Sequence, residues 1–151
     1  MSLYSLLKFV HVVLAIVAIG FNTSYAIWLR HAERQPEHAA HILRGIRALD
    51  GRFTTPAYVL LLVTGFALLT VGDIPFTTFW ILAALVLYAA VAIGGVVVYA
   101  PVLRAQTALA EAGRIDSDEY RRVARRGAVI GGLLILLVFS IEFLMVTKPT
   151  L

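Results

Sequence analysis

The sequence predicts an all-α fold, a transmembrane four-helix antiparallel bundle that forms a single domain over residues 1–151. Three observations lead to this prediction. Only 15% of the residues are charged, whereas a soluble domain usually carries about 25%. The charged residues are clustered, and they leave four apolar runs of about 18 residues or more, each long enough to cross the hydrocarbon core of a bilayer. The arginines gather in two of the three connections between these runs.

The first helix is expected over residues 3–29, because no Asp, Glu, Lys or Arg occurs from Phe9 to Leu29. The run lacks the basic start and the A-x-A-like end of a cleavable signal peptide, so we expect it to stay in the mature protein. Small and polar residues recur along it at steps of four and three positions, which keeps them on one helical face turned into the bundle. These residues are His11, Ala15, Ala18, Asn22 and Tyr25.

The connection at residues 36–53 is predicted to be an amphipathic helix. Its apolar residues fall near one stripe, while its arginines and histidines mostly lie elsewhere. Such a helix either lies in the headgroup region or packs on the end of the bundle. The second membrane helix is expected over residues 55–71, where Thr54 or Thr55 can cap the backbone and Pro56 occupies a first-turn position.

The third and fourth helices are expected over residues 77–112 and 117–147, as a long hairpin that extends beyond the membrane. Asp116 and Glu119 have the spacing of a capping box at the start of the fourth helix. Pro101 is expected to kink the third helix near the membrane interface. Small residues on both helices let their backbones approach closely. These include Ala90, Gly94, Gly127, Gly131 and Gly132.

The distribution of basic residues sets the expected orientation. Five arginines lie in the connection between the first and second helices, and six lie between the third and fourth. The short turn between the second and third helices has none, and each terminal region carries one lysine, Lys8 or Lys148. Basic connections tend to stay in the cytoplasm. We therefore expect both termini outside (N-out/C-out) and the third and fourth helices extended into the cytoplasm, in a bacterial inner membrane.

The composition also bounds the function. The chain has no cysteine, which rules out disulfides, thiol catalysis and cysteine-ligated metals. The basic residues behind its net charge of +4 flank membrane helices, so they indicate contact with anionic membrane lipid and not with nucleic acid. No Gly-rich phosphate loop, paired carboxylates or Ser-His-Asp set is evident. No catalytic residue is therefore assigned, which weighs against an enzyme without deciding the question.

Two ionisable residues fall inside the apolar runs. Glu142 is the only acid within the four spans, and an intramembrane acid is a functional-site hypothesis by default. His11 follows Lys8 by three residues and Glu142 precedes Lys148 by six, which places both groups about 5–9 Å inside the lysines. Several roles stay open. His11 or Lys8 pairs with Glu142 to fix the helix register, or the site holds a cofactor or an ion, or it handles protons on a transport path.

Four stretches resemble a known family. They read "LLKFVHVVLAI", "FTTPAYVLLLVTGFALL", "YRRVARRG" and "FLMVTKP". Over nearly its whole length the chain resembles a bacterial family of predicted four-helix integral membrane proteins of unknown function (DUF2269-like). More distantly, its first two helices are similar to the copper-resistance D family and to the haem-dependent, HemJ-type protoporphyrinogen oxidase. Those proteins share a Lys-x-x-His start to the first helix and a Thr-Pro start to the second.

The distant similarity implies haem binding by a histidine of the first helix, and this role carries over only onto His11. The third helix contains no lysine, which the oxidase needs as well. A haem b at His11 would be five-coordinate, use Met145 as a second ligand, or lie between two His11 residues of a homo-oligomer. Copper bound by His11, Glu142 and Met145 is also chemically reasonable. His38 and His41 share a helical face and form a weaker candidate metal site.

Three hypotheses follow. The first is an inner-membrane protein with an outer-leaflet site for haem b or a copper ion. The second is a non-catalytic membrane scaffold, an assembly partner or lipid-interacting protein. The third is a small ion or proton transporter. The residues assigned to the candidate site are His11, Glu142, Asn22, Tyr25 and Met145.

Overall fold

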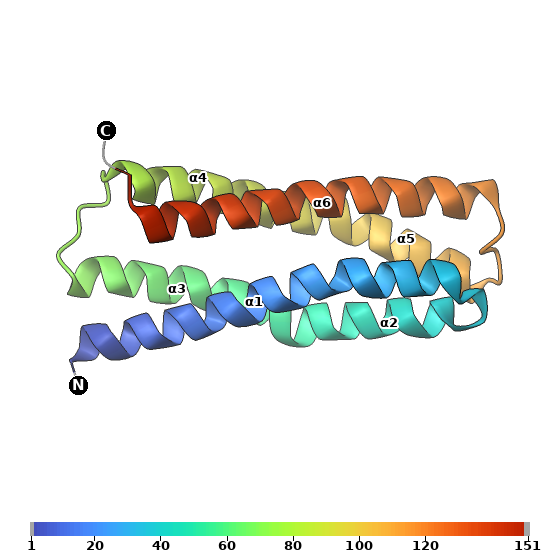
Figure 1. Ribbon diagram of the computed structural model, residues 1–151, viewed down its shortest axis with the longest axis horizontal. Helices are drawn as coiled ribbons and strands as arrows, with labels where there is room; N and C mark the ends of the chain where they lie inside the picture. Colours follow the sequence, from blue (N-terminus) through green and yellow to red (C-terminus); the bar gives the residue numbers. More distant parts are fainter. Residues whose placement is uncertain (1, 150–151) are drawn as a thin grey trace.

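The computed structural model describes residues 2–149, which form four long helical rods in antiparallel order (Figure 1). Both termini lie at one end, here called the termini end. The other end holds the two connections rich in arginine and is called the arginine end. All four rods are long and apolar enough to cross a membrane. The prediction of an all-helical protein with four membrane-spanning helices is therefore confirmed.

Two of the rods are uninterrupted and two are composite. The uninterrupted rods are α1 (Leu3–Arg34) and α6 (Asp118–Thr147). The second rod is built of the 3-10 turn η1 (Pro36–His38), α2 (Ala39–Leu49), the π-helical stretch η2 (Asp50–Thr54) and α3 (Thr55–Val71). The third rod is built of α4 (Phe79–Ile93), the π-helical stretch η3 (Gly94–Tyr99) and α5 (Ala100–Glu111).

Each π-helical stretch precedes a proline, Pro56 after η2 and Pro101 after η3. A proline inside a helix lacks the backbone N–H and its ring clashes with a carbonyl of the preceding turn, and a widened turn relieves both problems. The interruption expected at Pro101 is thus a π-helical stretch. The predicted cap at Thr54 or Thr55 is wrong, because the helix continues through both residues and Thr54 makes no capping hydrogen bond.

The start of α6 also differs from the expectation. Ser117, not Asp116, is the capping residue, and its hydroxyl accepts a 3.1 Å hydrogen bond from the backbone N–H of Tyr120. Glu119 does not complete a capping box. Its carboxylate instead pairs with Arg114 across the turn, with N and O atoms 2.7 Å apart. The capping prediction was therefore one residue out of register.

The rods form two layers that converge toward the arginine end (Figure 1). One layer contains α1, α2 and α3, and the other contains α4, α5 and α6. At the arginine end α2 packs against both α1 and α5. Nearer the termini the layers separate, and no Cα atom of α3 lies within 8 Å of one in α4 over the lengths described here.

The buried hydrophobic cluster lies mostly outside the apolar spans. The apolar part of α6, residues 127–147, is about 30 Å long, which matches the hydrocarbon core of a bilayer. Segments nearer the arginine end are therefore expected to extend out of the membrane. Most residues of the buried cluster belong to these segments. The cluster consists of Tyr25, Ala32, Ala39, Leu43, Ile46, Leu103, Leu109, Ala110, Tyr120 and Ala124.

The solvent explains this distribution. In water, apolar side chains gain free energy by burial against one another. In lipid, the acyl tails solvate the same side chains, so helix contacts depend on close packing and hydrogen bonds instead. Leu43 of α2 is completely buried, whereas Leu136 of α6 is 62% exposed to the surroundings of the chain. Of the two alternatives for the amphipathic connection, the contacts of α2 with α1 and α5 agree with packing on the bundle.

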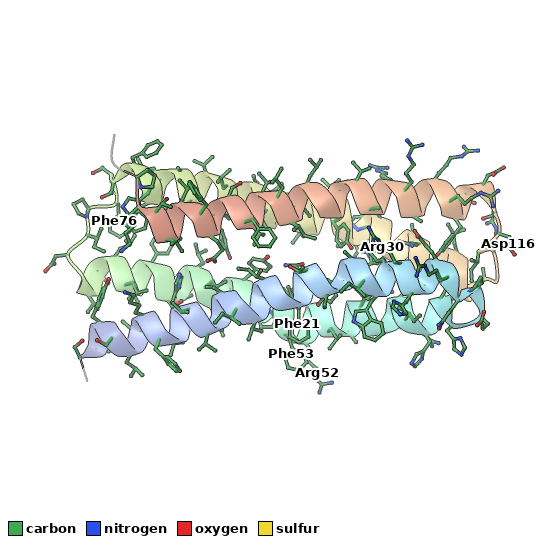
Figure 2. The ribbon with its side chains drawn as sticks, in the orientation of Figure 1. Phe21, Arg30, Arg52, Phe53, Phe76 and Asp116 are labelled. Carbon is green, nitrogen blue, oxygen red and sulfur yellow. The ribbon has the colours of Figure 1, made fainter. Side chains whose placement is uncertain are left out.

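Aromatic side chains pack between α1 and η2 near the middle of the molecule. The rings of Phe21 and Phe53 stack with their centroids 5.4 Å apart, and Arg52 beside them points away from the bundle (Figure 2). An arginine at the end of an apolar span can hold its charge in the headgroup layer while its aliphatic stem covers apolar surface.

Candidate functional site

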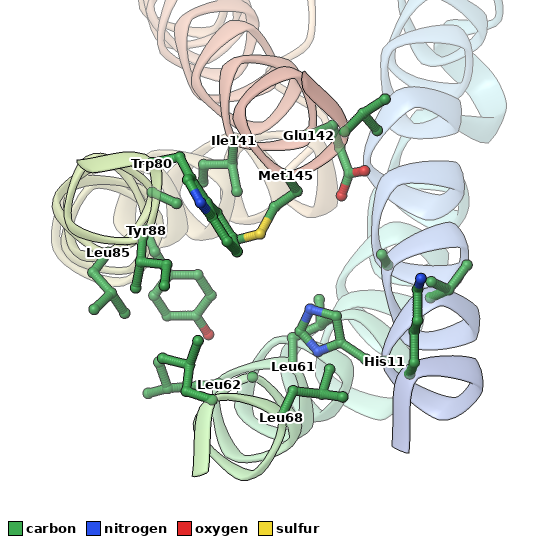
Figure 3. Close-up of a pocket in the computed structure, with 18 of the residues that line it drawn as sticks. His11, Leu61, Leu62, Leu68, Trp80, Leu85, Tyr88, Ile141, Glu142 and Met145 are labelled. Carbon is green, nitrogen blue, oxygen red and sulfur yellow. The ribbon is translucent and has the colours of Figure 1, made fainter. Parts of the chain in front are cut away.

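A cavity of about 530 Å³ lies between the two layers in the half of the molecule nearer the termini (Figure 3). Four helices, α1, α3, α4 and α6, contribute to its wall, and most of the lining side chains are aliphatic. The separation of the layers creates this space. The lining residues with polar or aromatic polar side chains are Tyr4, Lys8, His11, Tyr58, Trp80, Tyr88, Glu142 and Lys148.

His11 is held in the cavity by a hydrogen bond to the opposite helix of its layer. Its Nδ1 lies 2.7 Å from the hydroxyl oxygen of Thr64 on α3. The backbone of Gly65 packs closely beside the ring, since a Cβ there would lie 3.4 Å from Cε1 of His11. The imidazole projects into the cavity (Figure 3).

The surroundings of the Thr64 hydroxyl favour one tautomer of His11. A hydroxyl has one proton to donate, and the Thr64 oxygen lies 2.7 Å from the carbonyl oxygen of Leu60 and 3.2 Å from that of Leu61. With the Thr64 proton on a carbonyl, its oxygen accepts from His11, so we expect Nδ1 to carry the proton. Nε2 is left with its lone pair, which suits it to bind a metal or accept a hydrogen bond.

Glu142 and Met145 face the same cavity from one side of α6, three residues apart (Figure 3). Within residues 2–149 no hydrogen bond or salt bridge joins Glu142 to His11 or to Lys8. The alternative in which such a pair fixes the helix register therefore has no support from these contacts. His11 takes its partner from α3 because α1 packs directly against that helix, whereas α6 lies across the cavity.

Two lysines line the cavity near the termini. Lys8 lies on α1 one turn before His11, and Lys148 follows the end of α6. The ammonium group of Lys148 lies 5.5 Å from the centroid of the Trp80 ring, a favourable cation–π geometry. The wall of the cavity therefore carries two cations and one acid.

A layer of polar side chains lies between the cavity and the arginine end. Asn22 donates a 2.6 Å hydrogen bond to the hydroxyl of Tyr58, and Tyr88 donates one of 2.6 Å to the backbone carbonyl of Tyr58. The hydroxyls of Tyr25 and Thr54 lie 2.7 Å apart. The prediction that the polar face of the first helix turns into the bundle is confirmed by these contacts.

The structure divides the predicted site residues into two groups. His11, Glu142 and Met145 line the cavity, whereas Asn22 and Tyr25 do not. Sequence reasoning missed Thr64, the only hydroxyl residue other than tyrosine between Ala57 and Leu69. An isolated threonine in an apolar run is a usable signal, but its partner depends on how α1 and α3 are rotated against each other.

His38 and His41 lie at the arginine end, far along the chain from the cavity residues. Nδ1 of His38 is 3.3 Å from the carboxylate of the adjacent Glu37. Over residues 2–149 there is no group of three or more His, Cys, Asp or Glu side chains that could hold a metal ion. The structure thus offers no support for the weaker metal site.

Comparison with known proteins identifies a family. The model of the family described as "Predicted integral membrane protein (DUF2269)" matches residues 5–149. No curated protein and no solved structure matches the chain. The resemblance to a family of integral membrane proteins is confirmed, and the distant similarity to the two other families is not shown.

Proposed function

The chain belongs to the family of predicted integral membrane proteins DUF2269, and we propose that it binds a membrane-soluble anionic amphiphile in the cavity between its two layers. The ligand places its anionic group near Lys8 and Lys148 and its apolar body among the aliphatic side chains. The observation that carries the proposal is the combination of an apolar cavity with two cations and an imidazole lone pair. The cavity volume lies within the range of about 300–1,000 Å³ typical of small-molecule sites.

The arrangement of the helices supports entry from the lipid. Over their described lengths, no Cα atom of α3 lies within 8 Å of one in α4, so these two helices meet beside the cavity through side chains such as Tyr58 and Tyr88. A ligand already dissolved in the bilayer then needs side-chain movement, and not separation of packed helices, to enter.

Haem b is the ligand suggested by the distant resemblance, and the lining side chains fit its chemistry. A haem can be held by a single imidazole, for which Nε2 of His11 is suitable. Lys8 and Lys148 would pair with the two carboxylates of the haem, and the aromatic rings of Trp80 and Tyr88 would form part of the cavity wall beside it. A bound haem would supply one-electron or oxygen chemistry to the site.

A copper ion fits this cavity less well. A haem brings its own four nitrogen ligands, whereas an isolated ion depends on protein side chains for its coordination. His11, Glu142 and Met145 come from two helices on opposite sides of the cavity, and no cluster of three His, Cys, Asp or Glu side chains occurs in the described part of the chain. We therefore favour an amphiphile over a bare metal ion.

The proposal is tested by identifying what the purified protein carries. The full chain is purified in mild detergent, its absorption spectrum is recorded, and extracted small molecules are identified by mass spectrometry. We expect a bound anionic amphiphile that is lost in Ala15→Phe, because the larger side chain occupies part of the cavity one turn from His11. If the ligand is haem b, a Soret band is present in the wild type and lost in His11→Ala. His31→Ala, at an exposed histidine outside the cavity, is the matched control and should retain the ligand.

The outcomes separate the hypotheses. A cavity-dependent amphiphile without a Soret band would reject haem b and retain the proposal. If no small molecule is lost in Ala15→Phe, and none binds after loading with haem or anionic lipid, the proposal is wrong. The non-catalytic scaffold would then be the better account of the protein.

A further inference from the structure

A second candidate binding surface lies on one side of α6, away from the cavity. Its lining residues are spaced i, i+3, i+4, i+7 and i+8, so they lie on one face of the helix. We call this surface the arginine face. It consists of Arg122, Arg125, Arg126, Val129 and Ile130.

The arginine face lies at the expected level of the lipid headgroups. No charged residue occurs in α6 from Gly127 until Glu142, so this stretch suits the hydrocarbon core. The three arginines precede it directly. At 1.5 Å per residue, the distance along the helix from Arg122 to Arg126 is about 6 Å, which concentrates three positive charges in a thin layer.

These arginines lack the partners that their neighbours have. Arg114 pairs with Glu119, and Arg121 pairs with Asp118. Within residues 2–149, Arg122, Arg125 and Arg126 form no salt bridge and no side-chain hydrogen bond, and all three are exposed. Like charges one turn apart on a helix repel one another, so a bound anion would relieve this repulsion.

An apolar track continues from the arginines toward the termini end. Val129, Leu133 and Leu136 follow Arg126 at steps of three and four residues, which keeps them in line on the helix surface. Their exposed fractions are 58%, 58% and 62%. The arginine face thus joins a cationic end to an exposed apolar stripe inside the membrane.

We propose that the arginine face binds an anionic phospholipid. The guanidinium groups hold the phosphate, for which their planar arrangement of donors is well matched. The acyl chains lie along Val129, Leu133 and Leu136. This site differs from the cavity in position and in ligand. The proposal for the arginine face does not depend on the proposal for the cavity.

A second copy of the chain is a poorer occupant of this face. A symmetric dimer in a membrane has its two-fold axis along the membrane normal, and its interface joins identical surfaces. Such a dimer would bring six unpaired guanidinium groups together at one depth. The charge of the face is complementary to a phosphate and not to itself.

The test compares lipid binding by two variants that lose the same charge. The first carries Arg122→Gln, Arg125→Gln and Arg126→Gln. The control carries Arg30→Gln, Arg34→Gln and Arg47→Gln, three exposed arginines of the other connection. Delipidated full-length protein is titrated with phosphatidylglycerol and with phosphatidylcholine, and bound lipid is counted by native mass spectrometry. Circular dichroism checks that both variants keep the helical content of the wild type.

We expect the wild type and the control to prefer phosphatidylglycerol, and the first variant to lose that preference by about tenfold or more. Equal losses in both variants would show a general effect of charge and overturn the site. No preference in the wild type would also overturn it. Soluble glycerol phosphate should not compete, because it lacks acyl chains, and full competition would contradict a lipid site. Crosslinked dimers joined through this face would favour a second copy instead.

Discussion

At the scale of single residues, the hydrogen bond between His11 and Thr64 determines what the intramembrane histidine can do. The hydroxyl of Thr64 on α3 lies within hydrogen-bond distance of the Leu60 carbonyl, so we expect the imidazole to donate from Nδ1. The nitrogen that remains available, Nε2, belongs to a ring that projects into the cavity. Thr64 is therefore a positioning residue for His11 in the proposed ligand site.

Replacing Thr64 tests this assignment without reference to any ligand. Thr64→Val keeps the shape of the side chain and removes the acceptor, so the preference for a protonated Nδ1 should disappear. In protein labelled with ¹⁵N-histidine, we expect the His11 signals to show a protonated Nδ1 in the wild type. In the variant they should shift toward the Nε2-protonated form. Nitrogen NMR distinguishes the two tautomers directly.

Two further variants complete that experiment. Thr64→Ser retains a hydroxyl and should behave like the wild type, while His11→Gln identifies which signals belong to this histidine. A wild-type spectrum with the proton on Nε2 of His11 would refute the assignment. The tautomer could not be deduced from the sequence, because it depends on a threonine 53 positions away and on the rotation of two helices.

At the scale of elements, helices pack according to their solvent. The buried contacts of α2 with α1 and α5 lie mostly outside the apolar spans, where we expect water around the bundle, and the layers separate within those spans, where we expect lipid. The apolar stripe of α2 could be recognised in the sequence. Its partner could not, because a headgroup layer and a bundle end both present apolar surface. The π-helical stretches before Pro56 and Pro101 were likewise visible only as prolines in otherwise helical segments.

This difference in packing predicts different effects of the same substitution. Leu43→Ala leaves a cavity in the water-exposed core, where Leu43 is completely buried, and should lower the free energy of unfolding by about 2–5 kcal/mol. Leu136→Ala removes a side chain that contacts lipid and should have a much smaller effect. Denaturant or thermal unfolding in detergent micelles, followed by circular dichroism, measures both. Equal losses of stability would contradict the proposed division.

At the scale of the whole molecule, the four rods act as one bundle with two unlike ends. The termini end holds the cavity with Lys8 and Lys148, and the arginine end holds the buried cluster and both basic connections. Because the two ends differ in this way, one chain can combine the proposed ligand site in the bilayer with a tightly packed end in water. The positive-inside tendency predicts that the arginine end faces the cytoplasm.

The absence of cysteine from the sequence makes this orientation easy to measure. Thr77→Cys places a single thiol in the exposed turn at the termini end, and Ala112→Cys places one at the arginine end. In intact bacterial cells, a membrane-impermeant maleimide should label the first variant only. After the membrane is made permeable, both should react. Labelling of Ala112→Cys in intact cells, with Thr77→Cys protected, would reverse the predicted orientation.

The sequence by itself determined the membrane class, the number of spanning helices and the polar face of the first helix. Charge clustering and hydrophobic periodicity are properties of short stretches of sequence. They determine directly whether such a stretch is more stable in lipid or in water. Only the tertiary structure decided that Glu142 stays apart from His11, that Thr64 holds the imidazole, and that the layers separate around a cavity. These features depend on the relative rotation and spacing of helices, and in lipid the hydrophobic effect does not specify that spacing.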